Sequence, residues 1–166
     1  IIFAGNDTTR NTISGGIKLL HENQTQKDLL IQNLDLLPNF INETVRYVSP
    51  VIHMRRTSVE EAEINGQKIG PYEKISLWYG AANRDPEIFK NPNEFNILRE
   101  NADKHLAFGM GRHTCLGKPV ALMQLKEFYS QFLTRFNDFE MNGDWKVAPN
   151  NFVHAIQEMP IKFTPE

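Results

Sequence analysis

The sequence predicts a mainly α-helical protein with small antiparallel β-sheets. Two observations predict the helices: apolar residues recur at helical spacing, and a proline stands where a helix would begin. A third observation predicts the sheets, because the tail from Asp138 to Phe163 alternates short strand patterns with turn residues. The length of 166 residues suits one ordinary domain with a real core.

The first helix is expected from Ile1 to about Glu22, and Gly5, Gly15 and Gly16 interrupt its pattern. Each of these glycines costs about 1 kcal/mol relative to alanine, and a helix that carries such costs often needs room beside it. Prolines limit a later helix, since Pro38 suits a first turn and a helix stops before Pro50. The helices are therefore expected at residues 1–22, 28–33, 39–48 and 118–136.

Strands are expected between these helices and again after the last one. The Asn65-Gly66 pair predicts a type I′ turn, which makes residues 63–69 a hairpin. Residues 81–100 are expected to be irregular because Pro86 and Pro92 punctuate them. Extended segments are expected at 51–57, 63–69 and 74–79, and the tail has turns at 142–143 and 149–151.

The composition narrows the classes of function. With 18 basic and 20 acidic residues interspersed, a net charge of −2 implies no nucleic-acid partner. A single cysteine excludes an intramolecular disulfide, which is consistent with a reducing, cytoplasmic compartment. No apolar run approaches the roughly 20 residues of a membrane span, and no signal peptide is visible. A start at Ile1, apparently within a helix, predicts that the true N-terminus lies further upstream.

The single cysteine, Cys115, lies in a glycine-rich loop that a helical segment follows at once. Glycines at 109, 111 and 117 leave the backbone free of side chains and open to left-handed conformations. A thiolate just before a helix N-terminus is stabilised by free N–H groups and the helix dipole, and this suits an axial ligand to haem iron. The alternative is a buried structural cysteine, but the glycines, Phe108 and His113 favour the ligand.

The segment from Ala4 to Thr9 places an acid and a hydroxyl beside a glycine within the first helix. Thr8 can bond back to a carbonyl one turn earlier and loosen the helix. Gly5 leaves space for a small ligand or water, to which Asp7 and Thr8 could deliver protons. The alternative is a kinked helix with a solvated aspartate.

Two further pairs of charged residues are candidates. Glu43 and Arg46 stand three residues apart and share one helix face; their apolar neighbours favour a buried pair over a surface pair worth under about 1 kcal/mol. Arg55 and Arg56 lie in an extended segment, where one of them could clamp a carboxylate while its neighbour points the other way. The alternative is two solvated arginines.

The cysteine loop has further candidate groups. His113 could pair with a carboxylate of the cofactor, and Arg112 and Lys118 make the flank of the loop basic. The alternative for His113 is a hydrogen-bonded loop histidine. A zinc site built from His105, His113 and Cys115 is disfavoured because structural zinc uses closely spaced Cys/His pairs. No phosphate-binding glycine motif is present, so a nucleotide site has no support.

In this order, these segments resemble a single family, the cytochrome P-450 haem-thiolate monooxygenases. The run Phe108-Gly-x-Gly-x-His113-x-Cys115-x-Gly117 is similar to the family's haem-binding loop. Glu43-x-x-Arg46 resembles its K-helix pair, and Ala4-Gly5-x-Asp7-Thr8-Thr9 resembles the oxygen-activating groove of its I helix. The resemblance implies that residues 1–166 are the C-terminal part of a single cytochrome P-450 domain, without its N-terminal helices.

The resemblance also implies a role for each of these residues. Cys115 would bind the iron of haem b, with Gly5, Phe108 and Gly117 around the cofactor and Arg56 and His113 on its propionates. Asp7 and Thr8 would be the catalytic residues that handle protons and O₂. Arg55 remains an alternative to Arg56. The family usually has a basic residue within Pro92–Phe95, which completes a triad with Glu43 and Arg46. In this sequence Glu94 stands at that position, and Arg99 is the candidate substitute.

The implied function is hydroxylation of an apolar substrate with O₂ and with electrons from NAD(P)H. A ferredoxin-type donor and its reductase would deliver the electrons, because the sequence looks like the bacterial branch of the family. The substrate would be an alkane, fatty acid, terpene or sterol-like molecule, in contact with the start of the first helix, Val51–Met54 and the Phe152–Ile156 turn. The alternatives are a haem-binding sensor or carrier without turnover and a truncated inactive fragment.

Overall fold

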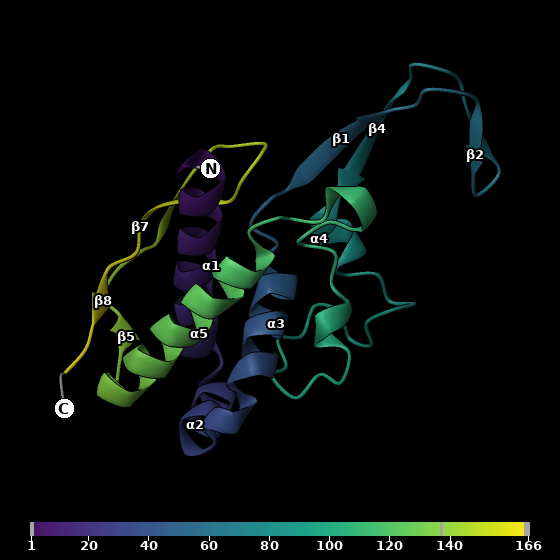
Figure 1. Cartoon of the computed structure of the whole chain (residues 1–166). Helices are drawn as coiled ribbons and strands as arrows, with labels where there is room; N and C mark the ends of the chain where they lie inside the picture. The colour runs from purple at the N-terminus through teal and green to yellow at the C-terminus, as the bar shows by residue number, and fades with distance from the viewer. Residues whose placement is uncertain (1, 137, 165–166) are drawn as a thin grey trace.

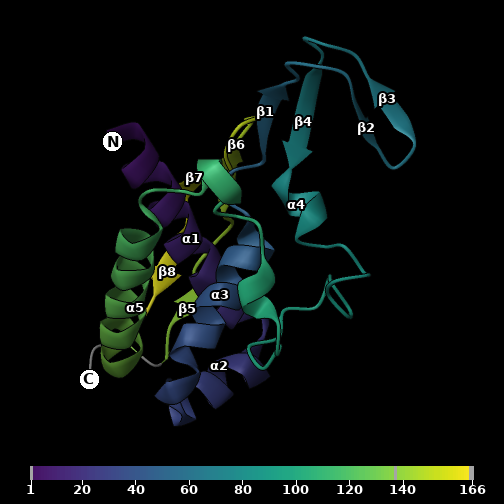
Figure 2. The same cartoon turned by 45° about the vertical axis from the view of Figure 1, so that its right-hand side comes forward.

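The computed structural model describes residues 2–136 and 138–164. Three long helices lie side by side and form the core: α1 (Ile2–Glu22), α3 (Leu37–Val48) and α5 (Lys118–Arg135) (Figures 1 and 2). Small two-stranded antiparallel sheets surround them. The predicted fold class is therefore confirmed, and the expected helix at 1–22 is present, although Ile1 lies outside the described residues.

The shorter helical segments depart from the sequence prediction in two places. They are α2 (Gln24–Gln32), α4 (Tyr79–Ala82) and the 3₁₀ turns η1 (Leu34–Leu36), η2 (Ala102–Lys104) and η3 (Gly111–His113). The predicted start of α2 at residue 28 is wrong, because its first turn is held by partners far along the chain: Gln26 accepts a bond from the Ile97 N–H, and Lys27 Nζ donates to the Phe139 carbonyl, 3.1 Å away. The predicted strand to residue 79 and the irregular start at 81 are also wrong, since α4 covers both positions.

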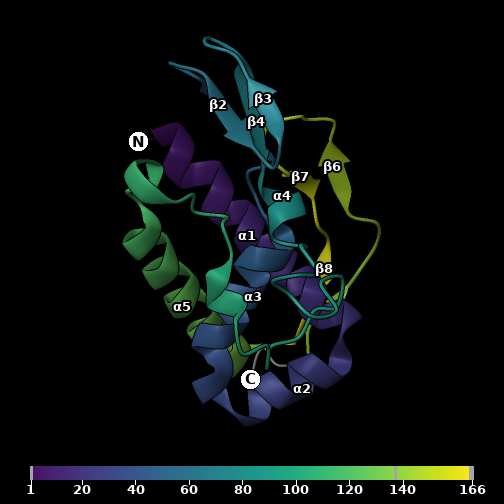
Figure 3. The same cartoon turned by 90° about the vertical axis from the view of Figure 1, so that its right-hand side faces the viewer.

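The strands form four two-stranded antiparallel sheets in the described part of the chain. Asn65 and Gly66 have φ angles of 49° and 79°, as a type I′ turn requires, so the predicted hairpin is confirmed. This hairpin projects away from the helices (Figure 3). The pairs are β1 (His53–Thr57) with β4 (Lys74–Trp78), β2 (Ala62–Ile64) with β3 (Gln67–Ile69), β5 (Glu140–Met141) with β8 (Ile161–Lys162), and β6 (Lys146–Ala148) with β7 (Ala155–Glu158).

The glycines of α1 allow close contact with its neighbours. A Cβ on Gly16 would lie 2.0 Å from the Tyr129 hydroxyl of α5, and one on Gly15 would lie 2.6 Å from Val48 of α3. The Tyr129 hydroxyl donates to the Ile13 carbonyl, 2.9 Å away. The prediction that this helix needs room beside it is confirmed, and α1 remains continuous through these positions.

The turn before β7 lies between two other parts of the chain. The Ile52 N–H donates to the Phe152 carbonyl at 2.8 Å, and the His154 N–H donates to the Pro50 carbonyl at 3.0 Å. On the other side, the Ile156 N–H donates to the Asn11 side-chain oxygen of α1 at 3.1 Å. This arrangement fixes the turn against the start of β1 and against α1.

Within the described residues, no helix has both the length and the apolar character needed to cross a bilayer.

Candidate functional site

Cys115 is exposed and stands directly before α5. Its N–H donates to the Phe108 carbonyl at 2.8 Å, and its own carbonyl accepts the Lys118 N–H at 3.2 Å. Gly117 precedes the first residue of the helix, and Pro119 lies in its first turn. The sulfur thus lies at the N-terminal end of an 18-residue helix, where the helix dipole favours negative charge.

Two glycines of this loop have a left-handed backbone conformation. Gly109 has a φ of 71°, and a Cβ there would lie 3.0 Å from the His113 carbonyl oxygen. Gly111 also has a positive φ, of 66°. A side chain at Gly109 would therefore strain the backbone and crowd the turn that leads to Cys115. A Cβ on Gly117 would lie 3.8 Å from the sulfur, an ordinary contact distance.

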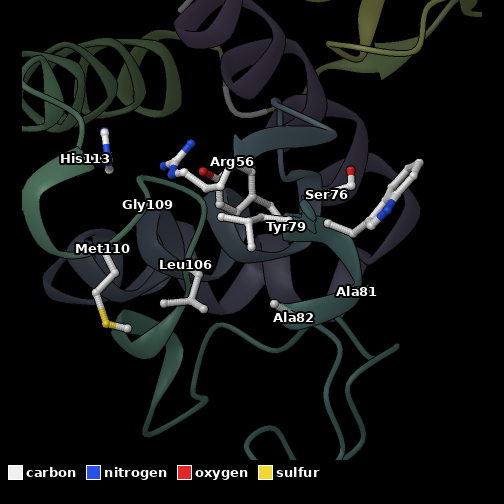
Figure 4. A pocket seen from close by; sticks show the side chains of 11 residues that line it. Arg56, Ser76, Tyr79, Ala81, Ala82, Leu106, Gly109, Met110 and His113 are labelled. Carbon is white, nitrogen blue, oxygen red and sulfur yellow. The ribbon is translucent and has the colours of Figure 1, made fainter. Parts of the chain in front are cut away.

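The structure brings Arg56 and His113 to one cavity of about 530 Å³ (Figure 4). The Arg56 guanidinium extends toward the part of the cavity where His113 lies. Arg56 is partly buried, whereas Arg55, its neighbour on β1, is exposed, as the alternating sides of a strand dictate. Of the two arginines, Arg56 is thus the one placed beside the cysteine loop. The cavity lining is Arg56, Ser76, Leu77, Trp78, Tyr79, Ala81, Ala82, Leu106, Gly109, Met110 and His113.

Three apolar side chains close to Cys115 in the sequence are accessible to solvent. Leu116 is 97% exposed, Met110 69% and Val120 53%. Soluble proteins rarely leave a contiguous apolar surface uncovered unless it binds a ligand or another protein. The site therefore offers one sulfur, one guanidinium, one imidazole and apolar flanks.

Gly5, Asp7 and Thr8 occupy the first turns of α1. The Thr8 hydroxyl donates to the Ala4 carbonyl at 2.9 Å, which confirms the predicted back-bond. Asp7 pairs with Arg10 at 3.1 Å, and a Cβ on Gly5 would meet no atom within 4 Å. The bonds described for Asp7 and Thr8 stay within α1, but the N-terminal ends of α1 and α5 lie at the same end of the core (Figures 1 and 3).

Glu43 and Arg46 form a buried pair rather than a surface pair. Two nitrogens of Arg46 bind the two carboxylate oxygens of Glu43 at 2.7 and 2.8 Å, and neither residue is exposed. Arg99 supplies the third member, with Nε at 3.0 Å from Glu43 Oε2. The Glu94 carboxylate instead accepts a bond from Asn91 at the surface. The candidate substitute Arg99 thus completes the network.

The remaining donors of this network hold the irregular segment at 83–99. Arg46 donates to the Asn83 and Pro92 carbonyls at 2.7 and 2.9 Å, and Arg99 donates to those of Asn91 and Glu94. These bonds satisfy the buried guanidinium groups, whose burial would otherwise be very costly. The network therefore orders a long loop that has little regular structure of its own.

Sequence reasoning missed the joint made by Asn83, which is fully buried. Its Nδ2 donates to the Ser49 hydroxyl at 2.9 Å, and its Oδ1 accepts the Leu106 N–H at 2.7 Å. It thus links the end of α3 to the start of the segment that leads to Cys115. The available signal was an asparagine in the segment predicted to be irregular, a position that favours a local turn as readily as a long-range contact.

His105 and Lys118 both lie next to the Phe108 ring of the cysteine loop. Burial, and secondarily the Lys118 charge, lower the pKa of His105 to about 4, so this imidazole is neutral at pH 7. Its Nδ1 accepts the Ala107 N–H. Lys118 is partly buried, with Nζ 5.5 Å from the centre of the Phe108 ring. Lys118, at the start of α5, is therefore only partly accessible to solvent.

Comparisons with known proteins agree on one family. The sequence model of cytochrome P-450 matches residues 18–164. Linalool 8-monooxygenase of Pseudomonas putida is 37% identical over 99% of this chain and 40% of its own length. Steroid C26-monooxygenase of Mycolicibacterium smegmatis is 39% identical over 99% of this chain and 41% of its own length.

Solved structures support the same assignment. Cytochrome P-450-153 from Novosphingobium aromaticivorans superposes with a TM-score of 0.93 and 38% identity, over 98% of this chain and 41% of that one. The chain thus spans about 40% of the length of the relatives it matches. Its fold is that of the C-terminal portion of this family, and we conclude that the chain belongs to the cytochrome P-450 family.

Proposed function

We propose that the protein of which these residues are the C-terminal part is a haem-thiolate monooxygenase that hydroxylates an apolar substrate. The observation that carries the proposal is the placement of Cys115, exposed at the start of α5, beside a cavity that Arg56 and His113 line. A soft sulfur ligand, two groups that bind carboxylates and an apolar rim match the chemistry of haem b, which has an iron, two propionates and an apolar ring.

The residues present fit this cofactor. Cys115 Sγ would hold the iron, because it is exposed at the N-terminal end of α5. Arg56 and His113 would hold the propionates, with the arginine offering two parallel N–H donors. The uncrowded wall at Gly5 leaves a face of α1 open to a ligand. When bound, haem supplies the O₂ and one-electron chemistry, and the thiolate favours O–O cleavage.

Asp7 and Thr8 would serve proton delivery on the α1 side. The Thr8 hydroxyl donates to the Ala4 carbonyl, so its oxygen lone pairs remain able to accept a proton donor such as water. The Asp7 carboxylate is partly exposed, which allows proton exchange with solvent, and Arg10 holds one of its oxygens. Together they form a short path from solvent to the Gly5 wall.

The proposed substrate is an alkane, fatty acid, terpene or sterol-like molecule. The names of the relatives, a linalool and a steroid monooxygenase, support this class. The two backbone bonds between 50–52 and 152–154 also support it, because they join two of the three segments expected to contact substrate. We further propose a ferredoxin-type donor with its reductase and a cytoplasmic location.

The reduced, carbon-monoxide-bound spectrum of the full-length protein tests the proposal. We expect the Soret band of a thiolate-ligated haem in the wild type, its loss in Cys115→His with some haem retained, and its persistence in the neighbouring control Met110→Leu. A wild type without this band would overturn the thiolate assignment. If the wild-type protein shows this band but consumes no NADPH when ferredoxin, its reductase and substrate are supplied, it would instead be a haem sensor or carrier.

A further inference from the structure

Asn11 is a fully buried polar residue that the proposed mechanism does not use. It lies three residues after Thr8, so both side chains project from neighbouring positions on α1. Its Oδ1 accepts the Ile156 N–H of β7 at 3.1 Å. Its Nδ2 is buried and has no hydrogen-bond partner among the residues that the structure describes.

The chemistry of the bond fixes how this amide is oriented. A backbone N–H can only donate, so the oxygen of Asn11 has to face Ile156 and the NH₂ group has to face the other way. A buried NH₂ without a partner costs stability, and buried waters commonly satisfy such groups. A leucine would fill a similar volume without a buried, unpaired NH₂ group, but it could not accept the Ile156 N–H. We take the acceptor oxygen to be the useful part of the Asn11 side chain.

That use concerns the edge of β7 that faces α1 and has no strand partner. In the sheet of β6 and β7, β7 pairs on one side only, so its other edge offers N–H groups without strand partners. Asn11 takes one of them. The turn before β7 is otherwise tied to residues 50–52, which lie in a different part of the fold. Among the residues that the structure describes, Asn11 thus provides a hydrogen bond that connects α1 to the backbone of this segment.

We propose that Asn11 is a positioning residue that sets where the segment at 152–156 stands relative to the Thr8 turn of α1. This proposal rests on the proposed function, in which both segments contact the substrate or its reaction partner. A substrate of this class would be held mainly by apolar contacts, so the distance between its apolar wall and the oxygen-handling turn would help to decide which carbon reacts. Asn11 would thereby control regioselectivity without touching the substrate.

Hydrogen exchange in the full-length holoprotein tests the tie directly. In Asn11→Ala, the Ile156 amide should exchange about 2- to 10-fold faster, as expected for the loss of one hydrogen bond. Asn11→Asp retains an oxygen acceptor and should exchange close to the wild-type rate. The matched control is Asn39→Ala, which removes an amide bonded to the Ile97 and Arg99 carbonyls in another region and should leave Ile156 unchanged.

The ratio of products tests the consequence of the tie, with n-octane, lauric acid and linalool as probes. We expect Asn11→Ala to change the ratio of hydroxylated positions by about threefold or more, with Asn11→Asp and Asn39→Ala close to wild type. If the alanine variant does not fold, Asn11→Ser, whose oxygen lies further from Ile156, replaces it.

The outcomes separate the two proposals. Wild-type turnover with an unchanged ratio in Asn11→Ala would overturn the positioning role alone. Unchanged Ile156 exchange in that variant would overturn the tie whether or not the enzyme turns over. A wild type that hydroxylates none of the three probes would overturn the positioning role together with the proposed substrate class.

Discussion

The Glu43 network and the Cys115 loop follow opposite designs. Glu43 and Arg46 have no solvent exposure, and their charged atoms are bonded to each other, to Arg99 and to backbone carbonyls. Cys115 is exposed and Leu116 is 97% exposed, in a loop held by short-range bonds to backbone carbonyls such as that of Phe108. Charge is thus buried and compensated in the first region, while apolar surface is left accessible in the second.

This difference separates stability from binding. A fully satisfied buried network loses heavily when one partner is removed, so the Glu43 region holds the long irregular segment in place. Surface loops contribute little to global stability and are where ligands commonly bind. We therefore expect substitutions in the network to change the free energy of unfolding, and substitutions in the loop to change binding or electron transfer.

The largest expected effect is that of Glu43→Ala. Removing this carboxylate leaves two buried arginines without their anion, which should cost about 3–5 kcal/mol in the free energy of unfolding. Denaturant unfolding of the full-length protein measures it. The control is Glu94→Ala, whose carboxylate is exposed and should cost under about 1 kcal/mol. Similar small losses in both variants would contradict the division between the two regions.

His105 provides a pH-dependent effect at the boundary of the two regions. Its folded-state pKa of about 4 lies below the unfolded value of 6.5, so the unfolded chain takes up a proton first as the pH falls. Stability is therefore fully present above pH 6.5 and is lost between pH 6.5 and 4, by about 3 kcal/mol. His105→Asn should flatten this part of the profile of unfolding free energy against pH. An unchanged slope would show that other groups titrate there.

Arg99→Lys should have a smaller effect within the network. The lysine keeps the charge but loses the planar set of donors that reaches Glu43 and three backbone carbonyls. We expect a loss of about 1–3 kcal/mol, measured by denaturant unfolding. A surface arginine such as Arg135, changed to lysine, serves as the control. Equal stability of Arg99→Lys and the wild type would mean that charge alone holds the segment.

The smallest expected effect, Lys118→Glu, decides to which region Lys118 belongs. If it steers an acidic ferredoxin, electron transfer should slow several-fold at low salt and recover at high salt, while peroxide-driven turnover stays near normal. Its position over the Phe108 ring allows the opposite result. Loss in both assays, independent of salt, would place Lys118 with the haem-supporting residues.

The sequence was sufficient for elements with local signals. The hairpin at Asn65-Gly66 and the helix after Pro38 depend on backbone preferences of a few residues, and both are present. The first turn of α2 was missed because Gln26 and Lys27 show no apolar periodicity and are helical through bonds to Ile97 and Phe139. Such contacts between distant segments leave no trace in local spacing.

The same limit applies to the candidate site. The cysteine loop was recognisable because glycines, cysteine and histidine fall within ten residues. Alternation along β1 left Arg55 and Arg56 equivalent until the position of the cavity distinguished them. The joints at Asn83 and Asn11 were missed because each connects segments that are more than 20 residues apart, and a lone asparagine does not indicate its partner.

The contact of Gly16 with Tyr129 has a mechanical consequence. It clamps α1 to α5 at a point eight residues, or about 12 Å along the axis, from Thr8. The part of α1 on the N-terminal side of this contact carries the Asp7-Thr8 turn and is tied to β7 through Asn11. The contact with Tyr129 therefore fixes the position of α1 along its own axis, and a change in the distance from Thr8 to the Cys115 loop would require bending of the first turns of the helix.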